Sequence, residues 1–143
     1  MIFCDTSTLA KYYVPEPENP AVRSRLDGAD QVALSELARI ELMAGFHRQL
    51  REGKWTRRQF SAFVQQFTRD ALGGQWTWLS LDHEIIDAGA SLYLTLSAAI
   101  YLRASDCLHL VTALHHGFTE IHTHDRHQLR AASALGIKAC SIA

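Results

Sequence analysis

Short apolar runs alternate with longer amphipathic segments along the whole chain, and this alternation limits the possible folds most strongly. The apolar runs predict strands at residues 2–4, 31–34, 76–81, 120–123 and 138–142. Apolar residues spaced three and four apart predict helices at about 6–10, 20–26, 35–50, 56–72, 82–94, 104–116 and 126–135. Parallel strands need long connections that are usually helical. The sequence therefore predicts an α/β fold with a central, mostly parallel sheet of about five short strands between helical layers.

Helix boundaries are marked by capping and helix-ending residues. Asn19 and Pro20 are a suitable cap and first residue for the second predicted helix. Gly53 is placed to end the helix from Ser35 to Leu50, and Thr56 can cap the next one. A short connection between two long helices predicts a helix hairpin that protrudes from the sheet region.

Length and composition are those of an ordinary globular domain. The chain has 143 residues, enough for one shared core, so one domain over residues 1–143 is expected. No apolar run is long enough to span a membrane, and the first residues do not resemble a secretion signal, so a cytoplasmic location is predicted. The three cysteines are Cys4, Cys107 and Cys140, which lie far apart in the sequence and form no Cys-x-x-Cys motif. They are interpreted as reduced core thiols.

The charge balance excludes bulk electrostatic capture of nucleic acid, because the net charge is only −1. Basic residues do gather in one part of the sequence. They form either a solvated helix face or an edge that meets RNA, and the sequence leaves both open. These residues are Arg39, Arg48, Arg51, Lys54, Arg57 and Arg58.

Four carboxylates occupy positions that the fold would bring together. Asp5 follows the first strand and Asp125 lies just past the fourth. Asp106 falls in the first turn of a helix, and Glu41 lies about one and a half turns into another. The carboxyl ends of parallel strands form one edge, where such folds bind their ligands. Singly, each Asp is typical of a helix cap and Glu41 of a solvated side chain, but together they predict a crevice.

Converging carboxylates repel one another unless a cation is shared among them. An oxygen-rich site of this kind suits Mg²⁺ or Mn²⁺. Such a cation would activate water for attack on a phosphodiester and neutralise charge on the leaving group. The carboxylate that would act as general base stays open.

Four motifs resemble those of PIN-domain ribonucleases, and among them the VapC-type toxins of bacterial toxin-antitoxin pairs. The resemblance spans the chain. The segment 1–9 ends its strand on Asp5 and continues with hydroxyl residues, while in 35–42 the family glutamate falls on Glu41. The most specific stretch is 103–114, in which Asp106 begins an apolar helix with His109 three residues on. Residues 123–125 resemble the closing motif, with Thr123 beside Asp125.

The resemblance implies a PIN-like three-layer α/β/α fold and Mg²⁺- or Mn²⁺-dependent endoribonuclease activity. It implies a homodimer that a small cognate antitoxin protein inhibits in a hetero-oligomer. The predicted catalytic and metal-binding residues are Asp5, Glu41, Asp106 and Asp125. Thr6 and Thr123 are predicted as supporting hydroxyls, and the predicted RNA contacts are Arg39, Arg103 and Arg126.

The antitoxin is expected on apolar residues of the hairpin near the crevice, namely Leu42, Met43 and Phe46, unless these are simply a two-sided buried face. The non-enzyme alternative is a PIN-like module that only binds a partner. An aspartyl phosphatase would need an acid where Ser7 stands, and a phosphoreceiver domain would need an acid pair and a late lysine that are missing. Zinc binding by the histidines is disfavoured because no His-Glu-x-x-His or Cys/His spacing occurs.

Overall fold

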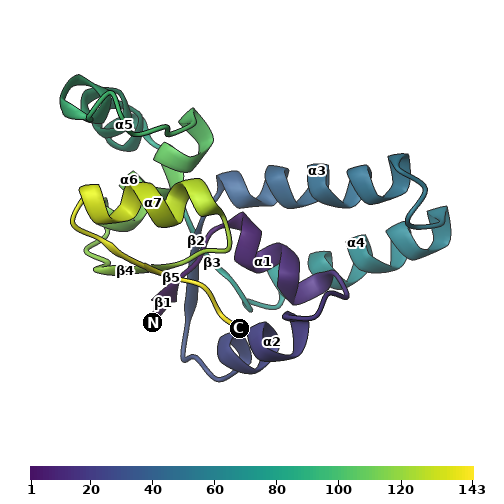
Figure 1. The fold of residues 1–143 in the computed structure, drawn as a ribbon. Helices are drawn as coiled ribbons and strands as arrows, with labels where there is room; N and C mark the ends of the chain where they lie inside the picture. The colour runs from purple at the N-terminus through teal and green to yellow at the C-terminus, as the bar shows by residue number, and fades with distance from the viewer.

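The computed structural model describes residues 1–143 and contains seven helices and five short strands (Figure 1). The elements follow one another as β1 (Ile2–Phe3), α1 (Thr6–Tyr13), α2 (Asn19–Asp27), β2 (Val32–Ser35), α3 (Leu37–Arg51), α4 (Arg57–Leu72), β3 (Thr77–Leu79), α5 (His83–Thr95), α6 (Ala104–His115), β4 (Glu120–His122), α7 (Arg126–Ala134) and β5 (Lys138–Cys140). The predicted alternation of strands and helices is confirmed.

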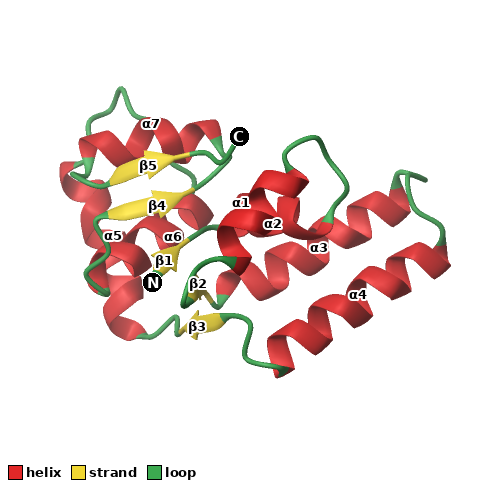
Figure 2. Ribbon diagram, turned by 90° about the horizontal axis from the view of Figure 1, so that it is seen from below, coloured by secondary structure: helices red, strands yellow, loops and turns green.

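All strand pairs are parallel, and together they give the order β3-β2-β1-β4-β5 (Figure 2). The strands β1 and β4 join through a parallel bridge between Cys4 and His122 and a hydrogen bond of 3.1 Å from Asp5 N to the His122 carbonyl. Asp5 therefore lies at the point where the two halves of the sheet join. Strand order reverses here, and such points in α/β sheets form ligand-binding crevices.

Helices cover both faces of the sheet, as predicted. Side chains alternate along each strand, so Cys4, Val32 and Leu34 face one core while Phe3 and Ala33 face the other. The helices α1 to α4 pack on the first face and α5 to α7 on the second. The result is a three-layer α/β/α fold.

The helices α3 and α4 form the predicted hairpin, which projects from the body (Figure 1). Thr56 makes a capping box with Gln59 at the start of α4, and Gly53 adopts a φ of 73°, which glycine tolerates without strain. Aromatic rings fill the hairpin, with Trp55 stacked on Phe63 at a centroid distance of 4.2 Å. Phe46 and Phe67 are buried in the core here, and Trp55, Phe60 and Phe63 are partly buried against it.

Some element boundaries differ from the sequence prediction. Both β3 and β5 are shorter than predicted. After β3, Leu81 leads directly into Asp82, which caps α5. The strand β5 ends at Cys140, and no further strand follows it. The helix α2 begins at Asn19, with Glu18 as its cap. The Asn19 side chain instead donates to the carbonyls of Lys11 and Tyr12, so it fastens α2 to the end of α1.

All cysteines are free, as predicted, but only Cys4 and Cys107 are buried while Cys140 is half-buried. No helix has the length and apolar character needed to cross a bilayer.

Candidate active site

The four predicted carboxylates lie around the carboxyl ends of β1 and β4. Asp5 follows β1 and caps α1, and Asp125 follows β4 and caps α7. Asp106 lies in the first turn of α6, and Glu41 reaches in from α3. Each Asp that caps a helix satisfies orphan backbone N–H groups, so its capping role and its place in the crevice coexist.

Asp5 is buried and accepts four hydrogen bonds. Its Oδ1 accepts from Ser7 Oγ at 2.7 Å and Thr8 N at 3.1 Å. Its Oδ2 accepts from Thr123 Oγ1 at 2.7 Å and Gln128 Nε2 at 2.8 Å. Burial raises the pKa of Asp5, and the charge of His109 together with these hydroxyl and amide donors opposes that rise only in part.

Thr123 and Gln128 connect Asp5 to Asp125. Thr123 Oγ1 donates to Asp5 and accepts the backbone N–H of Asp125 at 3.0 Å. Gln128 donates from its side chain to Asp5 and from its backbone to Asp125 Oδ1 at 3.1 Å. The two carboxylates thus belong to one hydrogen-bonded unit at the end of β4.

Arg103 joins Asp106 to Asp125. Its Nε and Nη2 donate to the two oxygens of Asp106 at 2.7 and 3.1 Å, and Nη2 also donates to Asp125 Oδ2 at 2.7 Å. Hydrogen bonding to Asp106 and the charges of both acids raise the pKa of the guanidinium further, so it stays charged. Arg103 therefore supplies the local positive charge of the crevice.

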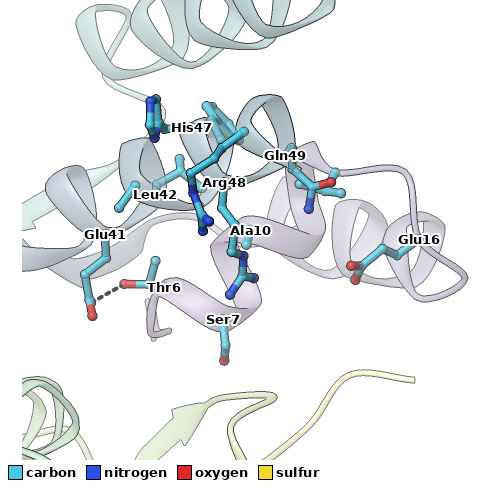
Figure 3. Close-up of a pocket in the computed structure, with 14 residues that line it drawn as sticks. Thr6, Ser7, Ala10, Glu16, Glu41, Leu42, His47, Arg48 and Gln49 are labelled. Atoms are coloured by element: carbon cyan, nitrogen blue, oxygen red, sulfur yellow. Dashed lines mark hydrogen bonds between the residues drawn. The ribbon is translucent and has the colours of Figure 1, made fainter. Parts of the chain in front are cut away.

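Glu41 is held from two sides. Thr6 Oγ1 donates to Glu41 Oε1 at 2.7 Å (Figure 3). His109 Nε2 contacts the same oxygen from the buried side. Burial raises the pKa of Glu41, but hydrogen bonds from His109 and Thr6 and the charges of His109 and Arg103 outweigh it, so the net shift is downward. Glu41 is therefore ionised at neutral pH.

The donor set fits a hard divalent cation, because it consists of carboxylate and hydroxyl oxygens. Buried polar atoms beside it, His109 Nδ1 and Gln128 Oε1, have no partner. The carboxylates are nevertheless not gathered into one ligand sphere, since the one group of three potential ligands within 4.8 Å of one another lies elsewhere. Asp5 is engaged by its four donors, and Arg103 bridges Asp106 and Asp125.

Among the predicted RNA contacts, only Arg103 lies in the crevice. Arg39 is exposed, pairs with Glu36 at 3.7 Å and lies over the Trp78 ring. Arg126 is exposed at the start of α7 and makes no ion pair. Sequence reasoning missed Ser7 and Gln128 as partners of Asp5. The only signal for Gln128 was its place one turn after Asp125 on a helix, which does not by itself reveal a contact with Asp5.

A groove of about 520 Å³ runs between α1 and α3 and opens at the crevice. Glu41 and Thr6 lie at one end and Glu16 at the other, and Arg48 points into it (Figure 3). Arg51 also lines the groove. Part of the predicted basic cluster thus borders a channel that leads to the carboxylates.

The prediction of an apolar partner surface on the hairpin near the crevice is wrong in part. Leu42 and Phe46 are buried in the core, so they offer no free surface to a partner. A second groove of about 630 Å³ does lie between α3 and α4. Met43 lines it together with the exposed Ile40 and with Leu37, Val64, Phe67 and Leu81.

The group of three potential metal ligands consists of Glu120, His122 and Cys140 on β4 and β5. This Cys–His pairing was not visible in the sequence spacing. The His122 ring contacts Cys140 through Nδ1 at 3.6 Å and Glu120 through Nε2 at 3.3 Å, and Lys138 pairs with Glu120 at 3.3 Å. The two contacts use different nitrogens of one ring, so the His122 ring lies between Cys140 and Glu120.

The family comparison matches this architecture. The model of the PIN domain family matches residues 2–134. The chain therefore belongs to the PIN domain family, whose members are generally nucleases. No curated protein sequence matches it.

Solved structures with the same fold include one described as a toxin-antitoxin complex, from Klebsiella pneumoniae, which aligns with a TM-score of 0.62 and 21% identity over 90% of both chains. FitAcB from Neisseria gonorrhoeae aligns with a TM-score of 0.76 and 21% identity over 97% of this chain and 96% of that one. VapC20 from Mycobacterium tuberculosis, described as a toxin that cleaves the sarcin-ricin loop, aligns with a TM-score of 0.71 and 14% identity over 96% of both chains. VapBC2 from Rickettsia felis, bound to a promoter DNA fragment, aligns with a TM-score of 0.71 and 12% identity over 100% of both. At these identities the likeness shows the fold.

Proposed function

We propose that the protein is a Mg²⁺- or Mn²⁺-dependent endoribonuclease and the toxin of a toxin-antitoxin pair. The observation that carries this proposal is the connected arrangement of Asp5, Asp125, Asp106 and Glu41 at the strand-order reversal of the sheet. Membership of the PIN domain family and the toxin-antitoxin structures that share the fold support it.

The four carboxylates are the proposed cation ligands. When bound, the cation supplies an activated water and neutralises charge on the phosphodiester. Glu41 presents an ionised carboxylate that His109 and Thr6 hold in one orientation. Thr123 and Gln128 fix Asp5 and Asp125 relative to each other, so this pair of carboxylates is preorganised.

RNA is the proposed substrate, and the groove between α1 and α3 is its proposed approach. Arg48 and Arg51 line the same groove as Glu41, where they can pair with backbone phosphates. Arg39 faces Glu36 and Trp78 on another side of α3, so we reassign the main hairpin contact with RNA to Arg48. Arg103 remains a proposed contact in the crevice, and Arg126 remains one on the exposed start of α7.

The proposed partners are a cognate antitoxin and a second copy of the chain, and the proposed location is the cytoplasm. The apolar groove between α3 and α4, with Ile40 exposed at 72%, supports a docked antitoxin segment. Exposed apolar residues on α5 and in the loop after it support a homodimer. The alternative function is a PIN-like module that binds partners without cleaving RNA.

RNA cleavage by purified protein tests the proposed function. We expect cleavage with Mg²⁺ or Mn²⁺, none with EDTA, and a loss of at least about 100-fold in Asp5→Asn and Asp106→Asn. Asp82→Asn is the matched control, because Asp82 also follows a strand and caps a helix, but its strand is β3 at the edge of the sheet. Cleavage that survives EDTA or both site substitutions contradicts the proposal, and inactivity of the wild type favours the binding module.

A further inference from the structure

One guanidinium occupies the space between two of the proposed metal ligands. Arg103 is the residue just before α6, and it donates to both oxygens of Asp106 and to Asp125 Oδ2. These three bonds are the only hydrogen bonds of its side chain. A bidentate pair plus a third charge-assisted bond makes Arg103 a specific counter-ion of these two carboxylates.

The ligand geometry agrees with this role. The Asp106 side chain is only 6% exposed, so its negative charge would be costly without a partner. No group of three carboxylates in the crevice has oxygens within 4.8 Å of one another, as a shared cation would require. Arg103 thus balances the charges of two carboxylates in an arrangement that is not yet the one a cation would need.

We propose that Arg103 is a resident counter-ion of the metal site, which a divalent cation must displace, and that it thereby sets the metal affinity of the site. This inference rests on the proposed function, because it takes the four carboxylates to be cation ligands. A guanidinium does not lose its proton in proteins, so it can yield only by moving away. Its side chain is 46% exposed and makes no hydrogen bond or ion pair beyond those to Asp106 and Asp125, so a path to solvent is open.

The consequence is a site that is stable without metal but binds it less tightly than its carboxylates alone would. A +1 guanidinium and a +2 cation at the same oxygens exclude each other by repulsion and by occupancy. Every cation that enters must therefore break the Arg103 bonds to Asp106 and Asp125. A higher metal concentration would then be needed to fill the site than if Arg103 were absent.

The test is direct measurement of Mn²⁺ affinity in Arg103→Gln, Arg103→Lys and wild type. Isothermal titration calorimetry and the electron paramagnetic resonance of free Mn²⁺ both report the dissociation constant without relying on activity. We expect Arg103→Gln to bind Mn²⁺ about tenfold more tightly, because charge-assisted bonds no longer compete. Arg103→Lys keeps the charge but loses the fork geometry, so its affinity for Mn²⁺ should fall between those of Arg103→Gln and the wild type.

Arg126→Gln is the matched control, because Arg126 is adjacent to Asp125 but makes no ion pair, and it should bind Mn²⁺ like the wild type.

Thermal unfolding provides a second readout. In EDTA, Arg103→Gln should unfold at a lower temperature than the wild type, and Mn²⁺ should raise its melting temperature more than that of the wild type. An unchanged or weaker Mn²⁺ affinity in Arg103→Gln overturns the inference, even if the wild type cleaves RNA. Tighter binding by this variant together with a wild type that cuts no RNA supports the inference and contradicts the proposed function. Absence of Mn²⁺ binding in every variant overturns both.

Discussion

Asp5 is expected to be a residue whose charge serves the active site at the expense of stability. Burial raises its pKa, so the folded, metal-free protein keeps its proton to a higher pH than the unfolded chain does. Asp5→Asn removes that charge. The Gln128 amide can then turn, so that its unpartnered Oε1 accepts from the new side-chain amide. In EDTA at neutral pH we expect the free energy of unfolding to rise by about 1 kcal/mol, while cleavage is lost.

The pH dependence gives this prediction its sign. The wild type should lose stability relative to Asp5→Asn as pH rises above about 4, where the unfolded carboxyl ionises, until Asp5 is ionised in both states. Urea unfolding at several pH values in EDTA measures the difference. A variant less stable than the wild type at neutral pH would show that the hydrogen bonds of Asp5 outweigh its burial.

Glu41 should behave in the opposite way. Its pKa is lowered overall, since contacts with His109 and Thr6 outweigh burial, so its ionisation stabilises the folded state. That contribution is present above the pKa of the unfolded carboxyl and is lost as pH falls through the lower folded pKa. Glu41→Gln should therefore destabilise the protein by about 1 kcal/mol at neutral pH in EDTA. The difference in free energy of unfolding from the wild type should vanish in acid. Urea unfolding of both proteins from neutral to acidic pH measures this difference. A difference that stays constant with pH would contradict the prediction.

For single residues, the sequence predicted which acidic side chains lie near one another. It did not predict the side chains that bind them. Asp5 and Asp125 follow strands and Asp106 begins a helix, which are positions that local pattern defines. Gln128 and Asp5 are far apart in the chain, and their contact depends on how β4 pairs with β1. The place of Arg103 between two carboxylates depends in the same way on the packing of α6 and α7.

The helix α3 contributes both Glu41, a proposed metal ligand, and the basic wall of the adjoining groove. Arg48→Glu reverses one charge that lines this groove, so RNA should bind more weakly, with KM raised about tenfold and kcat changed much less. Steady-state cleavage of a fluorescent RNA at two salt concentrations measures this. Arg58→Glu on α4 is the control, because Arg58 is exposed and does not line the groove. Equal effects of the two substitutions would mean that net charge, not the groove, attracts RNA.

Whole elements were the most predictable part of the fold. Helical periodicity and caps such as Thr56 are local signals, and the hairpin follows from them. The ends of β3 and β5 were less predictable, because a strand continues only where a neighbour offers hydrogen bonds. Asn19 shows the same limit, since its predicted capping role gives way to contacts with the end of α1 that require the tertiary fold.

The whole molecule carries its proposed dimer surface on the side of α5. Leu94 is 84% exposed, and Ile86, Tyr93 and Tyr101 are also exposed there. An apolar group of this kind on a folded surface indicates a contact with another protein. Sequence periodicity did not reveal it, because Ile86 and Leu94 fit the apolar pattern of a helix that packs on the sheet. Only the packing of α5 against α6 shows that both stay outside.

Leu94→Asp should convert the proposed homodimer into a monomer, because it places a charge in the centre of an apolar contact that would have to be desolvated. Sedimentation velocity at micromolar concentration measures the change. Leu72→Asp is the matched control, since Leu72 is 86% exposed at the end of α4 and should leave the dimer intact. Because all four carboxylates belong to one chain, the Leu94→Asp monomer should bind Mn²⁺ as the wild type does. A wild type that sediments as a monomer, or a Leu94→Asp protein that remains a dimer, would remove α5 as the dimer surface.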